Sequence, residues 1–106
     1  MRVALALFLV IHGLIHLLGA AKAFSLADLP QLTQPISTVF GALWLVAALL
    51  FLSTAASLFL WPGAWRAMAL GAVLVSSIVI LRSWTDANAG SLANVIVLVT
   101  LRWPPN

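Results

Sequence analysis

Long apolar runs separated by short polar stretches organise the chain, and they occupy residues 3–21, 36–60, 64–84 and 88–103. At about 1.5 Å of rise per residue, a helix of about 20 residues crosses the roughly 30 Å hydrocarbon core of a bilayer. The first three runs reach that length. The fourth has a short apolar centre, residues 92–101, and crosses only if residues 87–91 are helical too. The pattern predicts an all-α, four-helix transmembrane bundle that forms a single integral membrane domain over residues 1–106.

The polar stretches between the runs contain residues that end helices. Residues 22–35 hold two prolines and two glutamines, and their apolar side chains have the spacing of a short interfacial helix. Trp61-Pro62-Gly63 predicts a tight turn, and residues 85–91 predict a second one because they include Asp, Asn and Gly. In that second turn we expect Gly90 to supply the bend and Ser91 to cap the fourth helix.

Composition indicates that the solvent is lipid and excludes several classes of protein. Of the 106 residues, 64% are hydrophobic and 7% are charged, with a mean hydropathy of +1.18. A soluble domain of this size cannot bury so much apolar surface, and a disordered chain has the opposite composition. The net charge of +3 comes from five scattered basic residues, which form no stripe for nucleic acid. Without cysteine there is neither a disulfide framework nor a thiolate metal site.

The first run also has features of a secretory signal. Arg2 precedes it, and the small-x-small triplet Ala21-Lys22-Ala23 follows it. The run is long for the hydrophobic region of a signal and contains two histidines. We therefore favour a retained transmembrane helix.

Charged and aromatic residues predict the orientation in the membrane. With four spans, the N-terminus, the turn at residues 61–66 and the C-terminus share one side, which holds three arginines: Arg2, Arg66 and Arg102. The other side holds two basic residues and both aspartates. This excess of basic residues favours an N-in, C-in topology. We expect Trp61, Trp65 and Trp103 at the cytoplasmic interface, Trp84 at the outer one, and only Trp44 deep in the membrane.

Two histidines lie within the first run, at His12 and His16. Their i,i+4 spacing places both imidazoles on one face of a helix, about 6 Å apart along its axis. Ionisable side chains inside a membrane are costly and usually face the interior of the bundle, where they serve a function. Gly19 continues this face and Gly13 lies beside it, so a neighbouring helix can approach closely.

Three roles stay open for the two histidines: ligands of a metal or haem, protonatable ligand-binding groups, or hydrogen-bonding groups that hold helices together. Zinc needs further ligands, and only Asp28 and Asp86 remain as strong ones in a chain without Cys or Glu. Two histidines one turn apart cannot bind opposite faces of one haem, so such a haem would require a dimer. The sequence therefore favours the last two roles and predicts no metal site.

A second polar group follows the third run. Arg82 and Asp86 have i,i+4 spacing, which suits an ion pair if the helix continues, and Asn94 can hydrogen-bond across the bundle from inside the fourth helix. With the N-terminus inside, these residues and the Ser76-Ser77 pair lie in the outer half of the membrane. The open alternative is a charged, capped turn without a ligand. We predict a pocket between helices, lined by His12, His16, Lys22, Asp86 and Asn94.

Several strings of residues resemble an uncharacterised family of small bacterial four-helix membrane proteins, namely HGLIHLLGAAKAF, LPQLTQPIS, ALWLVAALLF and SWTDANAGSLANVIVL. The layout is also similar to that of the DoxX-like group, some of whose members are associated with quinone or thiol oxidation. The first family has no assigned reaction, and the second likeness is one of layout only. The resemblance implies a four-helix protein of the bacterial inner (cytoplasmic) membrane and assigns no catalytic residue.

Two functions follow as hypotheses. In the first, a small multi-pass protein binds a lipid-like or quinone-like ligand in an outer-leaflet pocket of a redox-associated system, with His16 as the proton-exchanging group. In the second, the protein is a structural or accessory subunit that packs on a larger membrane complex or on copies of itself. No nucleophile–base pair is recognisable, so the sequence favours a role other than catalysis.

Overall fold

The structure is a computed structural model that describes residues 2–26 and 36–102, and the regular structure in these ranges is entirely helical. Three helices are long and apolar enough to cross a bilayer when the third is counted from Pro62. The helices in chain order are α1 (Arg2–Ala23), α2 (Thr38–Leu60), the short 3-10 helix η1 (Pro62–Ala64), α3 (Trp65–Arg82), the short α4 (Trp84–Ala87) and α5 (Ala89–Thr100). The prediction of an all-α protein is confirmed.

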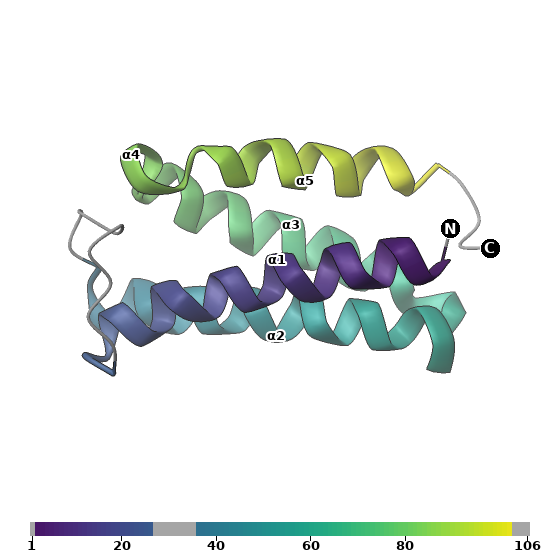
Figure 1. Ribbon diagram of the computed structural model, residues 1–106, viewed down its shortest axis with the longest axis horizontal. Helices are drawn as coiled ribbons and strands as arrows, with labels where there is room; N and C mark the ends of the chain where they lie inside the picture. The colour runs from purple at the N-terminus through teal and green to yellow at the C-terminus, as the bar shows by residue number, and fades with distance from the viewer. Residues whose placement is uncertain (1, 27–35, 103–106) are drawn as a thin grey trace.

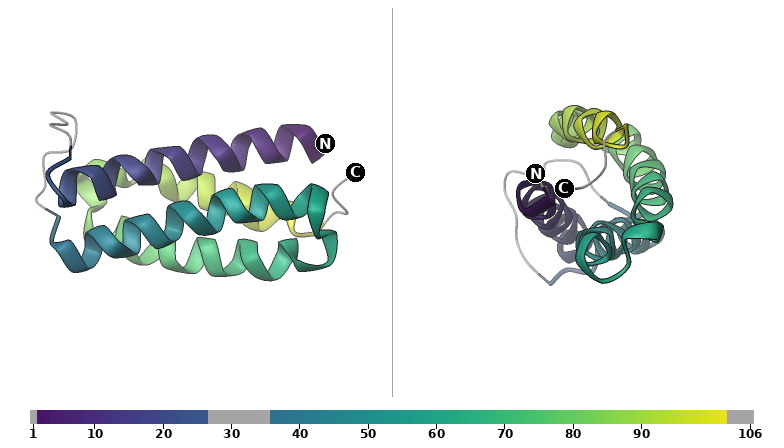
Figure 2. Two further views of the ribbon diagram at one scale, coloured as in Figure 1. Left: turned by 90° about the horizontal axis from the view of Figure 1, so that it is seen from below. Right: turned by 90° about the vertical axis from the view of Figure 1, so that its right-hand side faces the viewer.

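The helices lie side by side along one axis (Figure 1). Helix α1 packs on α2, α2 on α3, and α3 on α5. Viewed down the axis they follow an arc, with α1 and α5 at its two ends (Figure 2). The longest extent of the molecule is 39 Å. This is close to the roughly 40–45 Å thickness of a bilayer with its headgroup regions.

The ends of the long helices follow from local chemistry. Ser37 caps α2, because its hydroxyl accepts a hydrogen bond from the amide of Phe40 at 3.2 Å. The predicted turn at residues 61–63 is present, with Pro62 at the start of η1, where a missing amide hydrogen costs nothing. Helix α1 ends through Ser25, which has a φ of 58°. The predicted interfacial helix falls mainly on residues 27–35, which lie outside the described residues.

Residues 85–91 differ from their prediction as a turn. Residues 84–87 form α4, and α5 already begins at Ala89, so Gly90 and Ser91 lie within the first turn of α5 instead of bending and capping it. The reason is that Asn88 keeps right-handed helical angles, with φ −58° and ψ −30°. The backbone is therefore nearly continuously helical from residue 84 to residue 100, a length of about 25 Å.

Two clusters of buried apolar side chains hold the helices together. The larger one includes Leu9, Phe51, Trp65 and Val97, which come from all four layers of the arc. The smaller one contains Ala20, Trp44 and Val79 and lies toward the other end of the bundle. The outer faces are also apolar: exposed large side chains there include Leu7, Ile15, Leu49, Leu74 and Leu92. An apolar core with an equally apolar exterior is typical of a bundle solvated by lipid.

One tryptophan, Trp65, does not lie where the sequence predicts. Trp65 is 0% exposed and sits in the larger core cluster, so it does not face the membrane interface. Trp61 and Trp84 are exposed, and Trp44 is buried, as expected. Trp103 lies outside the described residues. Trp65 is buried because it begins α3 on the side that faces α1 and α2. Which side a tryptophan takes depends on the residue at which the helix starts, and the sequence does not fix that residue.

Candidate functional site: a polar network beside a cavity

Both histidines of α1 point into the bundle. His12 is 5% exposed and His16 is 1% exposed. Their ring centroids are 4.6 Å apart and their planes are almost perpendicular, at 89°. Phe51 of α2 packs on both rings, with centroid distances of 4.5 Å to His12 and 5.2 Å to His16. The i,i+4 spacing therefore has the effect that the sequence predicts.

Two hydrogen bonds determine which ring nitrogen of a neutral His16 carries the proton. Its Nδ1 lies 2.9 Å from the backbone carbonyl of His12, so Nδ1 carries the proton and donates. Its Nε2 is then the acceptor of a neutral ring, and it lies 2.7 Å from the hydroxyl of Ser76 on α3. Both nitrogens of His16 are thus occupied by the protein.

Asn94 of α5 continues this network to His12. Its amide nitrogen donates to the hydroxyl of Ser76 at 3.0 Å and to that of Ser77 at 3.3 Å. Its oxygen lies 2.9 Å from Nε2 of His12 and accepts from it. The shorter bonds therefore run from His12 to Asn94, from Asn94 to Ser76 and from Ser76 to His16, and the Ser76 hydroxyl also lies 3.3 Å from the Asn94 oxygen. Such a network stabilises the contacts between these helices. Apolar side chains alone contribute little there, because in a bilayer they can contact lipid equally well.

This arrangement changes the expected roles of the histidines. His16 has no free ring nitrogen, which argues against it as the proton-exchanging group. In a neutral His12, Nε2 carries the proton, so Nδ1 is an acceptor, and no described residue donates to it. The available nitrogen is therefore on His12.

A cavity of about 360 Å³ lies beside the histidines. Its walls come from α1, α2, α3, α4 and α5, and most of them are apolar. The lining residues are His12, Ile15, His16, Leu18, Gly19, Trp44, Ile80, Asp86, Ala87, Ala89, Gly90 and Ala93. Because Ile15 and Leu18 are also exposed on the outer face of α1, the cavity reaches the apolar exterior along that helix.

Small residues leave the space for this cavity and for the rings around it. A Cβ atom on Gly19 would lie 2.4 Å from Cδ2 of Trp44, so only glycine admits the indole ring at that position. A Cβ on Gly90 would lie 2.8 Å from Cδ1 of Ile80. Gly13 allows α1 to approach the backbone of α2, with a Cβ position 3.2 Å from the carbonyl oxygen of Ala48. The expected close approach at Gly13 and Gly19 is therefore present.

Trp44 is a residue of this cavity that the sequence analysis did not select. It is 4% exposed, its ring centroid lies 5.1 Å from that of His16, and its indole N–H has no hydrogen-bond partner among the described residues. A buried tryptophan usually finds an acceptor for this group. The sequence shows that Trp44 lies at the centre of an apolar run. It does not show whether the indole N–H finds an acceptor there.

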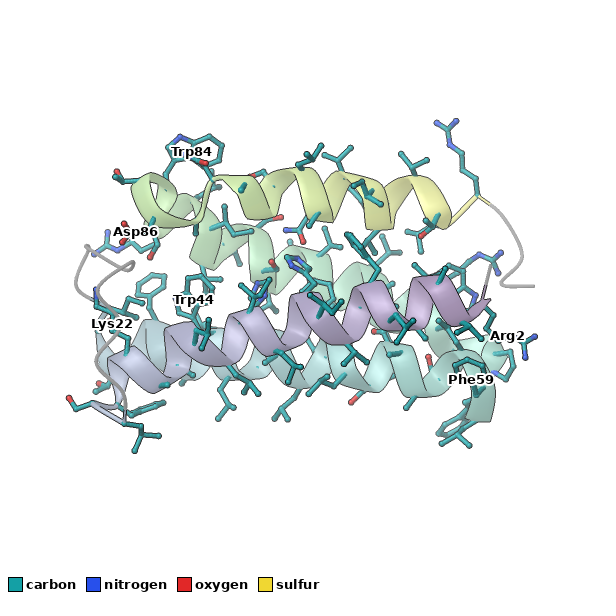
Figure 3. The ribbon with its side chains drawn as sticks, in the orientation of Figure 1. Arg2, Lys22, Trp44, Phe59, Trp84 and Asp86 are labelled. Carbon is teal, nitrogen blue, oxygen red and sulfur yellow. The ribbon has the colours of Figure 1, made fainter. Side chains whose placement is uncertain are left out.

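The predicted site residues occupy three kinds of position. His12, His16 and Asp86 line the cavity, and Asn94 stands behind it through its bond to His12. Lys22 does not line the cavity, although Lys22, Trp44 and Asp86 lie toward the same end of the bundle, opposite Arg2 (Figure 3). The helical i,i+4 geometry expected for Arg82 and Asp86 is interrupted, because α3 ends at Arg82 and Ser83 leaves the helical angles. The guanidinium of Arg82 lies over the ring of Phe40, 5.2 Å from its centroid.

The described residues contain no group of three or more His, Cys, Asp or Glu side chains that could hold a metal ion. Asp28, one of the two strong ligands that the sequence offers besides the histidines, lies outside this part of the chain. Among the polar groups beside the cavity, Nε2 of His12 and Nε2 of His16 make hydrogen bonds to other helices.

These features define a helical protein with three helices of membrane-spanning length, an apolar exterior and a cavity next to a buried polar network. Comparisons with protein-family models, with curated proteins and with solved structures found no match to this chain. The resemblance to small bacterial four-helix membrane proteins and to the DoxX-like layout therefore stays a prediction.

Proposed function

We propose that the protein is a four-span protein of the bacterial inner membrane, N-in and C-in, that binds a lipid-like or quinone-like ligand in the cavity beside His12. The observation that carries this proposal is the cavity itself, which combines mostly apolar walls with the ring of His12, whose Nδ1 accepts from no described residue. Ligand sites in proteins typically have this composition: mostly apolar walls with a few placed polar groups.

The position of α5 supports a fourth span. Together with α4 it extends along most of the bundle (Figure 1), and its end is fixed to the start of α3 by a hydrogen bond of 2.9 Å from Nε of Arg66 to the carbonyl of Leu101. The bundle ends also differ in charge. Arg2, Arg66 and Arg102 belong to one end, and Lys22, Arg82 and Asp86 to the other, a difference of one basic residue in the direction of the positive-inside rule.

The route into the cavity supports a ligand that arrives from the bilayer. Helices α1 and α5 stand at the two ends of the arc, and the cavity lies between them (Figure 2). Ile15 and Leu18 of α1 border it and are exposed to the surroundings of the bundle. An apolar molecule dissolved in the membrane can therefore reach His12 without passing through water.

A redox-associated role fits the same site if the ligand is quinone-like. Such a ligand supplies its own electron-transfer chemistry, and the protein supplies binding and orientation. Nδ1 of His12 is an acceptor, so it would hold a hydroxyl of the reduced, quinol form of such a ligand. The apolar walls, which include Ile80 and Ala93, would enclose the ring and exclude water.

The test is to identify what the cavity retains. We would purify the protein in a mild detergent, extract it with organic solvent and identify the bound small molecules by mass spectrometry. Ala93→Phe fills the cavity, whereas Val95→Phe places the same ring on the exposed face of the same helix. We expect a stoichiometric apolar molecule in the wild type and in Val95→Phe, and its loss in Ala93→Phe.

The same preparation tests the alternative function. Equal small-molecule content in all three proteins would contradict a ligand site in this cavity. Fixed partner proteins that co-purify with all three variants, together with no retained small molecule, would favour the accessory-subunit hypothesis.

A further inference from the structure

A second pocket, which we call the end pocket, lies at the end of the bundle where α2 begins and α3 ends. Its volume is about 320 Å³, and it shares no lining residue with the cavity beside His12. The residues that line it are Ile36, Ser37, Phe40, Arg82 and Ser83. Three of these five side chains carry hydrogen-bond donors, and none is acidic. The end pocket therefore offers donors and a positive charge, in contrast to the mostly apolar cavity.

Arg82 supplies the positive charge of the end pocket. Its guanidinium lies over the ring of Phe40, 5.2 Å from the ring centroid. No hydrogen bond or ion pair joins this guanidinium to another described residue. A cation–π contact leaves the N–H donors of a guanidinium without an acceptor atom, so the planar fork of Arg82 stays available for an anion.

Ser83 contributes a buried hydroxyl without a partner. The residue is 5% exposed, and no described residue hydrogen-bonds to its side chain. In the described part of the chain, the polar side-chain atoms that are both fully covered and unpartnered are the indole nitrogens of Trp44 and Trp65. The Ser83 hydroxyl is not one of them, so it keeps access to the end pocket that it lines. A buried hydroxyl without a partner incurs a desolvation penalty that a ligand in the pocket removes.

Ser37 brings a third donor, from the α2 side of the end pocket. Its Oγ accepts from the amide of Phe40 at 3.2 Å, which leaves the hydroxyl hydrogen without an acceptor among the described residues. Ser37 is also the N-cap of α2, and the N-terminus of a helix favours anions because of the helix dipole. One guanidinium and two hydroxyls therefore border the same pocket, and all three can donate to an anion.

We propose that the end pocket binds a phosphate group, either that of a phospholipid headgroup or free phosphate. Arginine holds phosphate through paired N–H donors, and the remaining oxygens of the group accept from the two serine hydroxyls. The position suits a headgroup, because Arg82 ends one helix of membrane-spanning length and Ser37 precedes another. The ends of such helices lie at the level of the headgroups in a bilayer. This site is independent of the proposed ligand beside His12.

Native mass spectrometry of the full chain in detergent micelles measures the binding of two lipid probes. These are dioleoylphosphatidylglycerol and dioleoylglycerol, which has the same acyl chains without a phosphate. Arg82→Gln removes the charge of the end pocket, and Arg102→Gln removes an exposed arginine at the opposite end of the bundle. We expect Arg82→Gln to bind the phosphatidylglycerol about tenfold more weakly than the wild type, because charge-assisted hydrogen bonds are lost. Arg102→Gln should bind it as the wild type does.

Two further variants test the geometry of the site. Arg82→Lys keeps the charge but not the planar fork, so it should give a loss between those of the wild type and Arg82→Gln. Ser83→Ala breaks no hydrogen bond among the described residues, so it should fold normally and bind the phosphatidylglycerol several-fold more weakly. Ser53→Ala is its control, because Ser53 is exposed on α2 and does not line the end pocket.

Inorganic phosphate, added as a competitor, identifies the source of the phosphate group. Displacement of the phosphatidylglycerol at millimolar phosphate would identify free phosphate as the ligand, and retention of the lipid would identify the headgroup. Equal losses in Arg82→Gln and Arg102→Gln would overturn the proposal, since a general attraction between arginine and anionic lipid would then explain binding. Equal binding of the two lipids to the wild type would overturn phosphate as the group that is recognised.

Discussion

At the scale of single residues, Ser76 joins the two halves of the polar network. Its hydroxyl donates to His16 and accepts from Asn94. Ser76→Ala leaves a buried ring nitrogen without a donor, so we expect the free energy of unfolding to fall by about 1–2 kcal/mol. Ser77 makes a single long bond of 3.3 Å to Asn94. Ser77→Ala is therefore the control, with an expected loss below about 0.5 kcal/mol.

Reversible unfolding in mixed detergent micelles measures both substitutions. A double variant, Ser76→Ala with His16→Phe, should lose less than the sum of its two single variants, because each removes the same hydrogen bond. Full additivity, or an equal loss for Ser76→Ala and Ser77→Ala, would mean that the bond between Ser76 and His16 contributes nothing to stability.

Ser25 carries a second prediction at this scale. Its φ of 58° places it in the left-handed region, where a side chain is disfavoured. The amide of Leu26 reaches back to the carbonyl of Ala21 at 2.8 Å, the bond that closes a Schellman-type helix end. Ser25→Gly should stabilise the fold by about 0.5–1 kcal/mol, since glycine adopts this conformation freely.

The control for this helix end is Ser25→Ala, which keeps a Cβ atom in the left-handed conformation and should give no gain. Thermal unfolding in detergent, followed by circular dichroism, separates the two variants. If alanine stabilised as much as glycine, backbone strain at Ser25 would not be the cause.

At the scale of helices, the contact between α1 and α2 depends on the absence of a side chain at Gly19. Gly19→Ala places a Cβ atom 2.4 Å from the ring of Trp44, which is itself packed on His16. We expect a loss of about 1–3 kcal/mol, as for overpacking in a dense core, and a change in the fluorescence of Trp44. Gly71 on α3 has no atom within 4 Å of its Cβ position. Gly71→Ala should therefore be neutral or stabilising by up to about 1 kcal/mol.

The long helices could be predicted from the sequence, because an apolar run of bilayer length must satisfy its backbone hydrogen bonds within the membrane, and a helix does so within the segment itself. The i,i+4 rule placed His12 and His16 on one inward face for the same reason. The region around residues 85–91 was read incorrectly, since Asp, Asn and Gly favour a turn locally. In the structure, Asn88 keeps helical angles and α5 packs on α3 from its first turn. Local preference is weak where tertiary packing decides the backbone.

The site was only partly predictable for a related reason. The sequence identified polar residues by their cost in lipid, which selected His12, His16 and Asn94 correctly as interior groups. It could not rank His12 above His16, because that ranking depends on the hydrogen bonds of Ser76 and Asn94 from two other helices. Trp44 was missed because an unpaired N–H is a property of its surroundings and not of its position in an apolar run.

At the scale of the whole molecule, the proposed topology can be tested with single cysteines, because the chain contains none. Gly63 lies in the exposed turn before α3 with no atom within 4 Å of its Cβ position, and Thr85 is exposed on α4 at the opposite end of α3. In an N-in, C-in protein, a membrane-impermeant maleimide should label Thr85→Cys in intact cells. It should label Gly63→Cys and Asn106→Cys only after permeabilisation, since the three sites alternate across α3 and α5. Labelling of Gly63→Cys alone in intact cells would contradict the positive-inside assignment. Labelling of Asn106→Cys together with Thr85→Cys would show that α5, the shortest of the four apolar helices, does not cross the membrane.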